Sequence, residues 1–171
     1  MSPVATEHWR LLLDDCVGHK EVEVQKAAVS AYAQLLRTYL YDEDGRLQTA
    51  YRDNLYLHFI RSLEGCSETK QSGFLQVLAG APVDLFAGHV EHVLGLVSAA
   101  CRISPRTRSW GDARSSALKS LLGSCHRLTI IRTLGHRHPE LNPELLFSLG
   151  PVLLQSLSDY TLDSRGDIGS R

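Results

Sequence analysis

Neither sign of charge predominates in this sequence. Its 18 lysines and arginines nearly balance 19 aspartates and glutamates, giving a net charge of −1 and an isoelectric point of about 6.7. Such a chain has no basic field to hold a nucleic-acid backbone or an anionic membrane. Long apolar runs are also missing: the longest, residues 93–101, is interrupted by Gly95 and Ser98. A bilayer span needs roughly 20 residues. We therefore expect no nucleic-acid partner and no membrane span, and residues 1–8 lack the features of a secretory signal.

Closely spaced cysteines are absent too. The four cysteines lie far apart in the sequence, and none belongs to a C-x-x-C motif: Cys16, Cys66, Cys101 and Cys125. Chains that rely on disulfides or on structural zinc usually space their cysteines much more closely. We therefore expect buried, reduced thiols in a cytosolic protein.

Eight histidines raise the question of a metal site. His89 and His92 lie one helical turn apart, a spacing that lets two imidazoles share one ion, while His136 and His138 fall in a turn. No cysteine or carboxylate at ligand spacing completes either pair. We expect no metal and no cofactor. A small metallohydrolase that uses His89, His92 and a distant carboxylate is the minor alternative.

The usual signs of an enzyme are also missing. No nucleophile elbow or paired-carboxylate arrangement is visible, and the glycines are dispersed rather than gathered in a phosphate-binding loop. The tripeptide Arg165-Gly166-Asp167 matches an adhesion motif only by coincidence, because its neighbours resemble the start of a helix. A small basic loop at residues 102–108 indicates a solvated turn or part of a protein-binding edge. We therefore expect a binding protein rather than an enzyme.

Helical periodicity is present along nearly the whole chain. Hydrophobic residues make up 43% and charged residues 22%, as in a globular domain. Apolar residues recur three and four positions apart within residues 22–40, 47–63, 74–78, 86–101 and 110–125. Pro3 and Pro143 follow Ser2 and Asn142, the arrangement of a helix cap with proline at the first helical position. Strand alternation is nowhere sustained, so the sequence predicts an all-α fold of about seven helices.

The predicted helices fall into pairs. Ala28, Phe74, Ala117 and Ile168 occupy similar places in the second helix of each pair, at intervals of 46, 43 and 51 residues. HEAT and armadillo repeats have periods of about 40–47 residues. We therefore predict one segment of HEAT/armadillo-like repeats (an α-α superhelix) over residues 1–171. Its repeats cover approximately residues 2–40, 46–80, 83–127 and 142–171, with the last one truncated.

The last dozen residues are polar and follow the apolar run of residues 146–157. Asp159, Thr161, Asp163 and Ser164 offer side-chain oxygens that can cap a helix. We therefore interpret residues 161–167 as a capping turn that opens a further helix at residues 163–171. Because so few residues remain for that helix, we expect a fragment or short isoform of a longer solenoid.

Residues 158–170, the tail motif, resemble a signature of the tubulin-specific chaperone D family, also called tubulin-folding cofactor D. The signature reads D-Y-T-x-D-S-R-G-D-[VI]-G-[ST], and the positions that carry it are Asp159, Tyr160, Thr161, Asp163, Ser164, Arg165, Gly166, Asp167 and Gly169. Residues 69–82 are similar to the family's R-x-G-[FY]-x-x-A-L-G-x-[LF]-P helix, with departures at Gln71 and Ala79-Gly80. Residues 110–114 resemble another repeat less specifically.

This resemblance implies a cytoplasmic, cytoskeleton-associated chaperone that binds β-tubulin and supports assembly of the αβ-tubulin dimer. Its implied partners are tubulin-folding cofactors E and C and an Arf-like small GTPase, and the family's complexes also stimulate GTP hydrolysis by tubulin. No catalytic residue of the family maps onto this chain. The alternative is a generic HEAT/armadillo scaffold with another protein partner.

Overall fold

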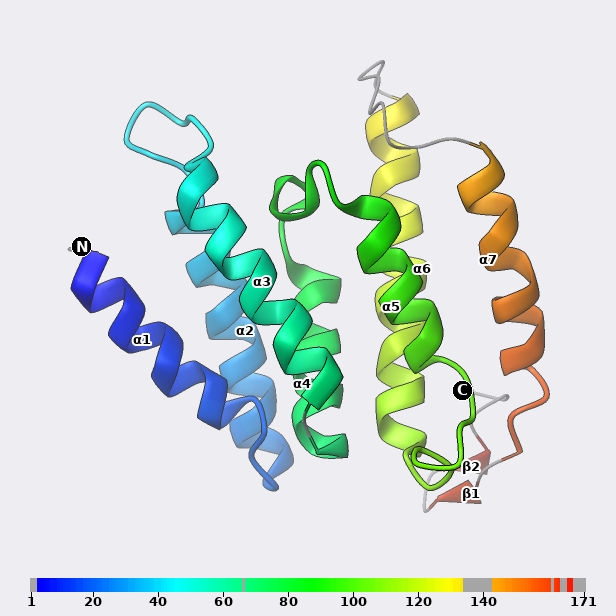
Figure 1. Ribbon diagram of the computed structural model, residues 1–171. Coiled ribbons are helices and arrows are strands. Elements are labelled where there is room, and N and C mark those ends of the chain that lie inside the picture. The colour runs from blue at the N-terminus through cyan, green and yellow to red at the C-terminus, as the bar shows by residue number, and fades with distance from the viewer. Residues whose placement is uncertain (1–2, 66, 134–142, 161, 164–165, 168–171) are drawn as a thin grey trace. The chain divides into compact units, whose positions relative to one another are not determined.

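The computed structural model describes residues 3–65, 67–133, 143–160, 162–163 and 166–167 (Figure 1). Seven α-helices run through this described part: α1 (Pro3–Cys16), α2 (Val22–Tyr39), α3 (Thr49–Gly65), α4 (Glu68–Gly80), α5 (Val90–Ala100), α6 (Gly111–Thr133) and α7 (Pro143–Ser156). A short 3-10 helix, η1 (Val83–Phe86), precedes α5. The only strands among the described residues are β1 (Leu162–Asp163) and β2 (Gly166–Asp167). The fold is all-α, and this prediction is confirmed.

Several helix boundaries follow from local chemistry. Pro3 and Pro143 are the first residues of α1 and α7, as predicted, because the first helical N–H has no partner to lose. Ser2 and Asn142, their expected caps, lie outside the described residues. Between α2 and α3 the chain turns back at Gly45, whose φ of +76° is accessible mainly to glycine. One oxygen of Asp42 accepts backbone N–H groups within that turn and closes it.

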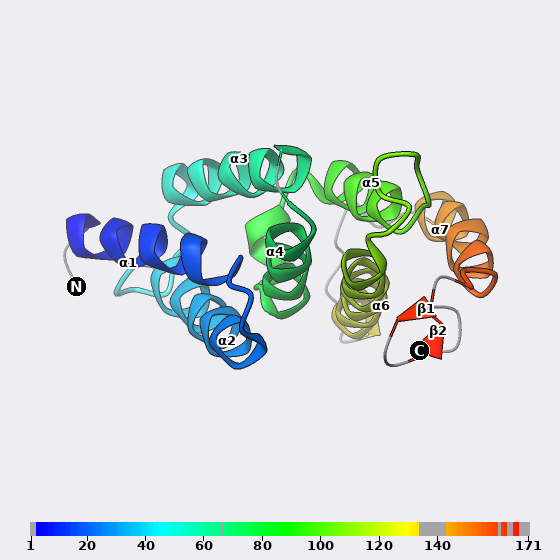
Figure 2. The ribbon, with the colours of Figure 1, turned by 90° about the horizontal axis from the view of Figure 1, so that it is seen from below.

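The chain divides into two compact units, Met1–Leu85 and Phe86–Arg171. In the first unit α2 and α4 pack side by side, while α1 packs on α2 and α3 packs on α4 (Figure 2). Tyr32, Phe59 and Phe74 meet at the centre of this unit with ring centroids 5.6–6.4 Å apart. Such tilted and edge-on contacts are the favoured aromatic geometry. The stripe predicted on residues 22–40 is buried at Ala28, Tyr32, Leu35 and Leu36.

A glycine sets the distance between α4 and the turn after α1. Gly73 lies on α4, and a Cβ added there would be 2.9 Å from the carbonyl carbon of Val17 and closer still to its oxygen. The side-chain amide of Gln25 donates to that same oxygen at 2.9 Å and to the carbonyl of Thr69 at 3.0 Å. Three helices of the first unit are therefore tied together where the backbone of Val17 meets α4.

In the second unit α5 packs on α6, and α7 packs against both (Figure 1). Three small residues of α6 are buried: Ala113, Ser116 and Ala117. In the first unit Ala28 of α2 is buried, whereas Ala27 and Ala31 are exposed. The predicted helix of residues 86–101 is also wrong at its start. Phe86 belongs to η1, because Gly88 turns the chain with a φ of +84° and α5 begins only at Val90.

The expectation of a helix start in the tail motif is wrong for the residues that the structure describes. β1 and β2 pair antiparallel, with Leu162 opposite Asp167 and Asp163 opposite Gly166. Antiparallel pairing satisfies backbone groups across the hairpin, whereas a helix would need partners four residues apart. Glycine is also an unfavourable residue within a helix, and Gly166 falls where the first turn would continue. Within the described residues, no second helix follows α7.

Cys101, at the end of α5, is a free buried thiol, and Cys16 is free and partly exposed. Burial raises the pKa of the Cys101 thiol to about 12. Because only the thiolate is alkylated, we expect iodoacetamide at pH 8 to modify Cys101 in the folded protein on the order of 10³-fold more slowly than a free cysteine. Mass spectrometry of the Cys101 peptide after timed labelling measures this rate, with Cys16 as the internal reference. Equal alkylation rates at Cys16 and Cys101 would contradict the burial of the Cys101 thiol.

Candidate protein-binding site

A buried ion pair joins the tail motif to α6. Arg114 is 0% exposed and Asp159 is 4% exposed, and Nε of Arg114 donates to Oδ2 of Asp159 at 2.6 Å. These two residues are 45 positions apart in the chain. The sequence context of Asp159 is that of a helix cap and does not indicate this partner. Its carboxylate neutralises a buried guanidinium, which is the condition under which such a charge is tolerated in an interior.

The same guanidinium holds the loop between α5 and α6. Nη1 of Arg114 donates to the carbonyl of Thr107 at 2.5 Å, and Nη2 donates to the carbonyl of Arg108 at 3.3 Å. A planar guanidinium presents its N–H donors in a fixed fork, so one side chain can satisfy several acceptors at once. Arg114 thus brings together the helix α6, the 102–110 loop and the start of the tail.

The 102–110 loop also carries order of its own. The hydroxyls of Ser104 and Thr107 lie 2.7 Å apart, and the N–H of Thr107 donates to Oγ of Ser104 at 3.1 Å. The guanidinium carbon of Arg106 lies 5.5 Å from the ring centroid of Trp110, within the range of a cation–π contact. The loop is therefore fixed at both ends before any partner binds.

Exposed side chains lie in the two segments that Arg114 contacts, the 102–110 loop and the start of the tail. Tyr160 directly follows the buried Asp159 and is 76% exposed. Arg106 and Arg108 of the loop are exposed as well, as the sequence predicted for this basic segment. We call Arg106, Arg108 and Tyr160 the loop–tail surface. Arginine and tyrosine are enriched at protein interfaces, and here both come from backbone segments held by Arg114.

The residues of the tail motif have different environments. Asp159 is buried and Tyr160 is exposed. Asp163, Gly166 and Asp167 belong to the two-stranded hairpin. Thr161, Ser164, Arg165 and Gly169 lie outside the described residues. The structure thus brings Asp159 together with Arg114 and pairs the backbone of the hairpin residues.

The described residues contain no group of three or more His, Cys, Asp and Glu side chains that could hold a metal ion. His89 immediately precedes α5, and His92 lies exposed in its first turn. His136 and His138 lie outside the described residues. Across the part of the chain that is described, no helix is both long and apolar enough to cross a bilayer.

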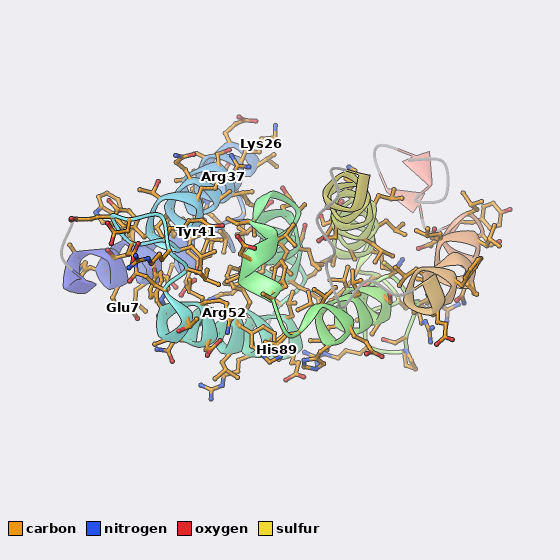
Figure 3. All side chains as sticks on the ribbon, turned by 90° about the horizontal axis from the view of Figure 1, so that it is seen from above. Glu7, Lys26, Arg37, Tyr41, Arg52 and His89 are labelled. Atoms are coloured by element: carbon orange, nitrogen blue, oxygen red, sulfur yellow. The ribbon has the colours of Figure 1, made fainter. Side chains whose placement is uncertain are left out.

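A second polar cluster, in the first unit, was not anticipated from the sequence. Asp14 of α1 is 6% exposed and accepts three hydrogen bonds: from the Tyr32 hydroxyl at 3.0 Å, from Arg10 at 2.8 Å and from Nε2 of His58 at 3.0 Å. Burial, and then the charge of Asp14, raise the pKa of the Tyr32 phenol. Glu7, labelled on α1 in Figure 3, binds the other side of the Arg10 guanidinium, and this hydrogen bond lowers the pKa of the Glu7 carboxyl. The cluster ties α1 to α2 and α3.

The i, i+4 spacing of Arg10 and Asp14 was the one local signal of this cluster, since such pairs meet on a helix surface. Nothing local to Asp14 indicates Tyr32 or His58, which are 18 and 44 residues away. With all three donors directed at one buried carboxylate, the arrangement serves packing of the helices.

Comparison with known proteins adds no family: no protein-family model matches the chain, and no solved structure matches it.

Proposed function

We propose that this chain is a segment of HEAT/armadillo-like helical repeats from the tubulin-folding cofactor D family, and that it binds β-tubulin and supports assembly of the αβ-tubulin dimer. Tubulin-folding cofactors E and C and an Arf-like small GTPase are its proposed partners, in the cytoplasm and at the cytoskeleton. GTPase-activator activity belongs, in this proposal, to the complexes that the chain joins. The chain itself acts by binding.

The tail motif is the observation that carries this proposal. The first residue of its signature, Asp159, has a structural role, since it is the partner of the buried Arg114. The helix order supports the repeat assignment, because α1 packs with α2, α3 with α4 and α5 with α6. Helix pairs that each pack on their sequence neighbour are typical of solenoid repeats.

The loop–tail surface is the proposed contact with tubulin. Its two arginines and one tyrosine lie on backbone that is already ordered, so binding would cost little conformational entropy. Truncation of arginine and tyrosine anchors at interfaces commonly costs 2 kcal/mol or more, about 30-fold in affinity.

Purified chain and purified αβ-tubulin, mixed and measured by biolayer interferometry, test this function. We expect saturable binding, a loss of about 30-fold or more in the double variant Arg108→Glu/Tyr160→Ala, and no more than about a 2-fold change in Arg46→Glu. Arg46 is the matched control because it is 80% exposed in the turn between α2 and α3 and carries the same charge reversal.

Other outcomes separate the alternatives. Failure of the intact chain to bind β-tubulin, αβ-tubulin or the Arf-like GTPase, when a longer family member binds them, would reject the proposal. The generic HEAT/armadillo scaffold then becomes the better account. Stoichiometric zinc in the purified chain would instead support the metallohydrolase alternative.

A further inference from the structure

A groove lies between α5 and α7 in the second unit, with a volume of about 520 Å³. Leu149 and Val152 of α7 provide apolar lining, and successive turns of α5 form the other wall. Its volume is in the range of known ligand sites, about 300–1,000 Å³. None of the three loop–tail residues lines it, so its role is independent of the proposed tubulin contact.

The middle of the groove contains a glycine that packing does not explain. Gly95 lies within α5, where glycine costs roughly 0.5–1 kcal/mol relative to alanine. A Cβ added to Gly95 would meet nothing within 4 Å, so no neighbouring group in the structure requires its absence. The missing side chain leaves the backbone of α5 open to the groove. Glycine at such a position permits close approach of another backbone.

Next to this opening is a polar group without a partner. Ser98 lines the groove and is 8% exposed, and its buried hydroxyl makes no hydrogen bond to any residue that the structure describes. A buried hydroxyl left unsatisfied is costly, and one rotation about the Cα–Cβ bond redirects it. A ligand in the groove that offers a backbone carbonyl or N–H would supply the missing partner.

The ends of the groove carry opposite charges. Glu91 is in the first turn of α5, and Arg102 is the second residue after its end. Both are exposed, and neither forms an ion pair within the described part of the chain. They are eleven positions apart in the chain, or about 16 Å at the helical rise of 1.5 Å per residue. An extended peptide covers that distance in about five residues at roughly 3.3 Å each. The groove therefore complements a peptide with a basic and an acidic residue at its two ends.

We propose that the α5–α7 groove binds a short extended peptide segment of a partner protein. A basic side chain of the peptide meets Glu91, an acidic side chain meets Arg102, and apolar residues between them contact Leu149 and Val152. The peptide backbone passes over Gly95 and bonds the hydroxyl of Ser98. The peptide can run in either direction, since only the placement of its charges is specified.

Panning a phage library of random heptapeptides against the full chain tests this proposal, with the Gly95→Leu chain as counter-selection. We expect enriched peptides with one basic and one acidic residue four to six positions apart and apolar residues between them. Synthetic copies, measured by fluorescence anisotropy, should bind Gly95→Leu at least 10-fold more weakly than the unaltered chain. Gly150→Leu is the matched control, because Gly150 is also a glycine of a helix with open space around it and does not line the groove. It should bind normally.

Two readouts separate binding from folding. Leucine is a better helix former than glycine, so Gly95→Leu should not lower the unfolding midpoint. Panning with Arg102→Glu should replace the acidic position of the enriched peptides by a basic one. Peptides with no charge pattern, equal affinity for Gly95→Leu, or the same acidic preference against Arg102→Glu would each overturn the proposal.

Discussion

Replacement of Asp159 by alanine is expected to lower the free energy of unfolding of the second unit by about 3–5 kcal/mol. The change removes the carboxylate that neutralises Arg114, whose buried guanidinium also donates to the carbonyls of Thr107 and Arg108, neither of which carries a balancing charge. An uncompensated buried charge carries most of that cost. Urea unfolding followed by the fluorescence of Trp110 measures it in a Trp9→Phe background, because Trp9 and Trp110 are the two tryptophans of the chain.

The neighbouring residue supplies the control. Tyr160 belongs to the same tail motif but is 76% exposed, so Tyr160→Ala should change the free energy of unfolding by no more than about 0.5 kcal/mol. The double variant Arg114→Met/Asp159→Leu should be more stable than either single variant, since removing both charges leaves no buried charge without its counter-ion. Equal stability of Asp159→Ala and Tyr160→Ala would mean that the pair does not stabilise the fold.

The same residue shows where sequence reasoning failed. Asp159, next to other polar residues after an apolar run, has the local features of a helix cap, and those features are all that a window of sequence contains. Its actual partner lies 45 residues earlier. Arg114 lies among small buried residues of α6. An arginine at such a position was the one sign in the sequence that a charged side chain would be buried there. The local pattern therefore indicates a polar residue at position 159 but does not indicate its pairing with Arg114.

Helices were predictable because their signal repeats within a few residues. The buried positions Tyr32 and Leu36 of α2 follow the four-residue spacing that the sequence shows. The prediction that Phe86 belongs to the same helix as Val90 was wrong because Gly88, with a φ of +84°, turns the chain between them. A glycine in a sequence does not reveal which backbone conformation it adopts. The Asp14 cluster and the α5–α7 groove both require knowledge of which helices become neighbours, and that information is not local.

Gly73 is the second position where a small change should have a large effect. We expect Gly73→Ala to lower the free energy of unfolding of the first unit by about 2–3 kcal/mol, as overpacking in a well-filled core commonly does. The new methyl group would meet backbone atoms of Val17 rather than a flexible side chain, so relief requires α4 to move. That movement would also disturb the hydrogen bond from Gln25 to the Val17 carbonyl. Trp9 fluorescence in a Trp110→Phe background reports on this unit during urea unfolding.

Gly95→Ala is the matched control for Gly73→Ala. Both glycines lie within helices, but an added Cβ at Gly95 meets nothing within 4 Å. Without a clash, only the helix propensity changes, and alanine should raise stability by about 0.5–1 kcal/mol. The two variants are thus expected to differ in sign. A gain of stability in Gly73→Ala would show that α4 does not approach Val17 this closely. A loss confined to Gly73→Ala assigns the cost to close approach of two backbones rather than to glycine as a residue type.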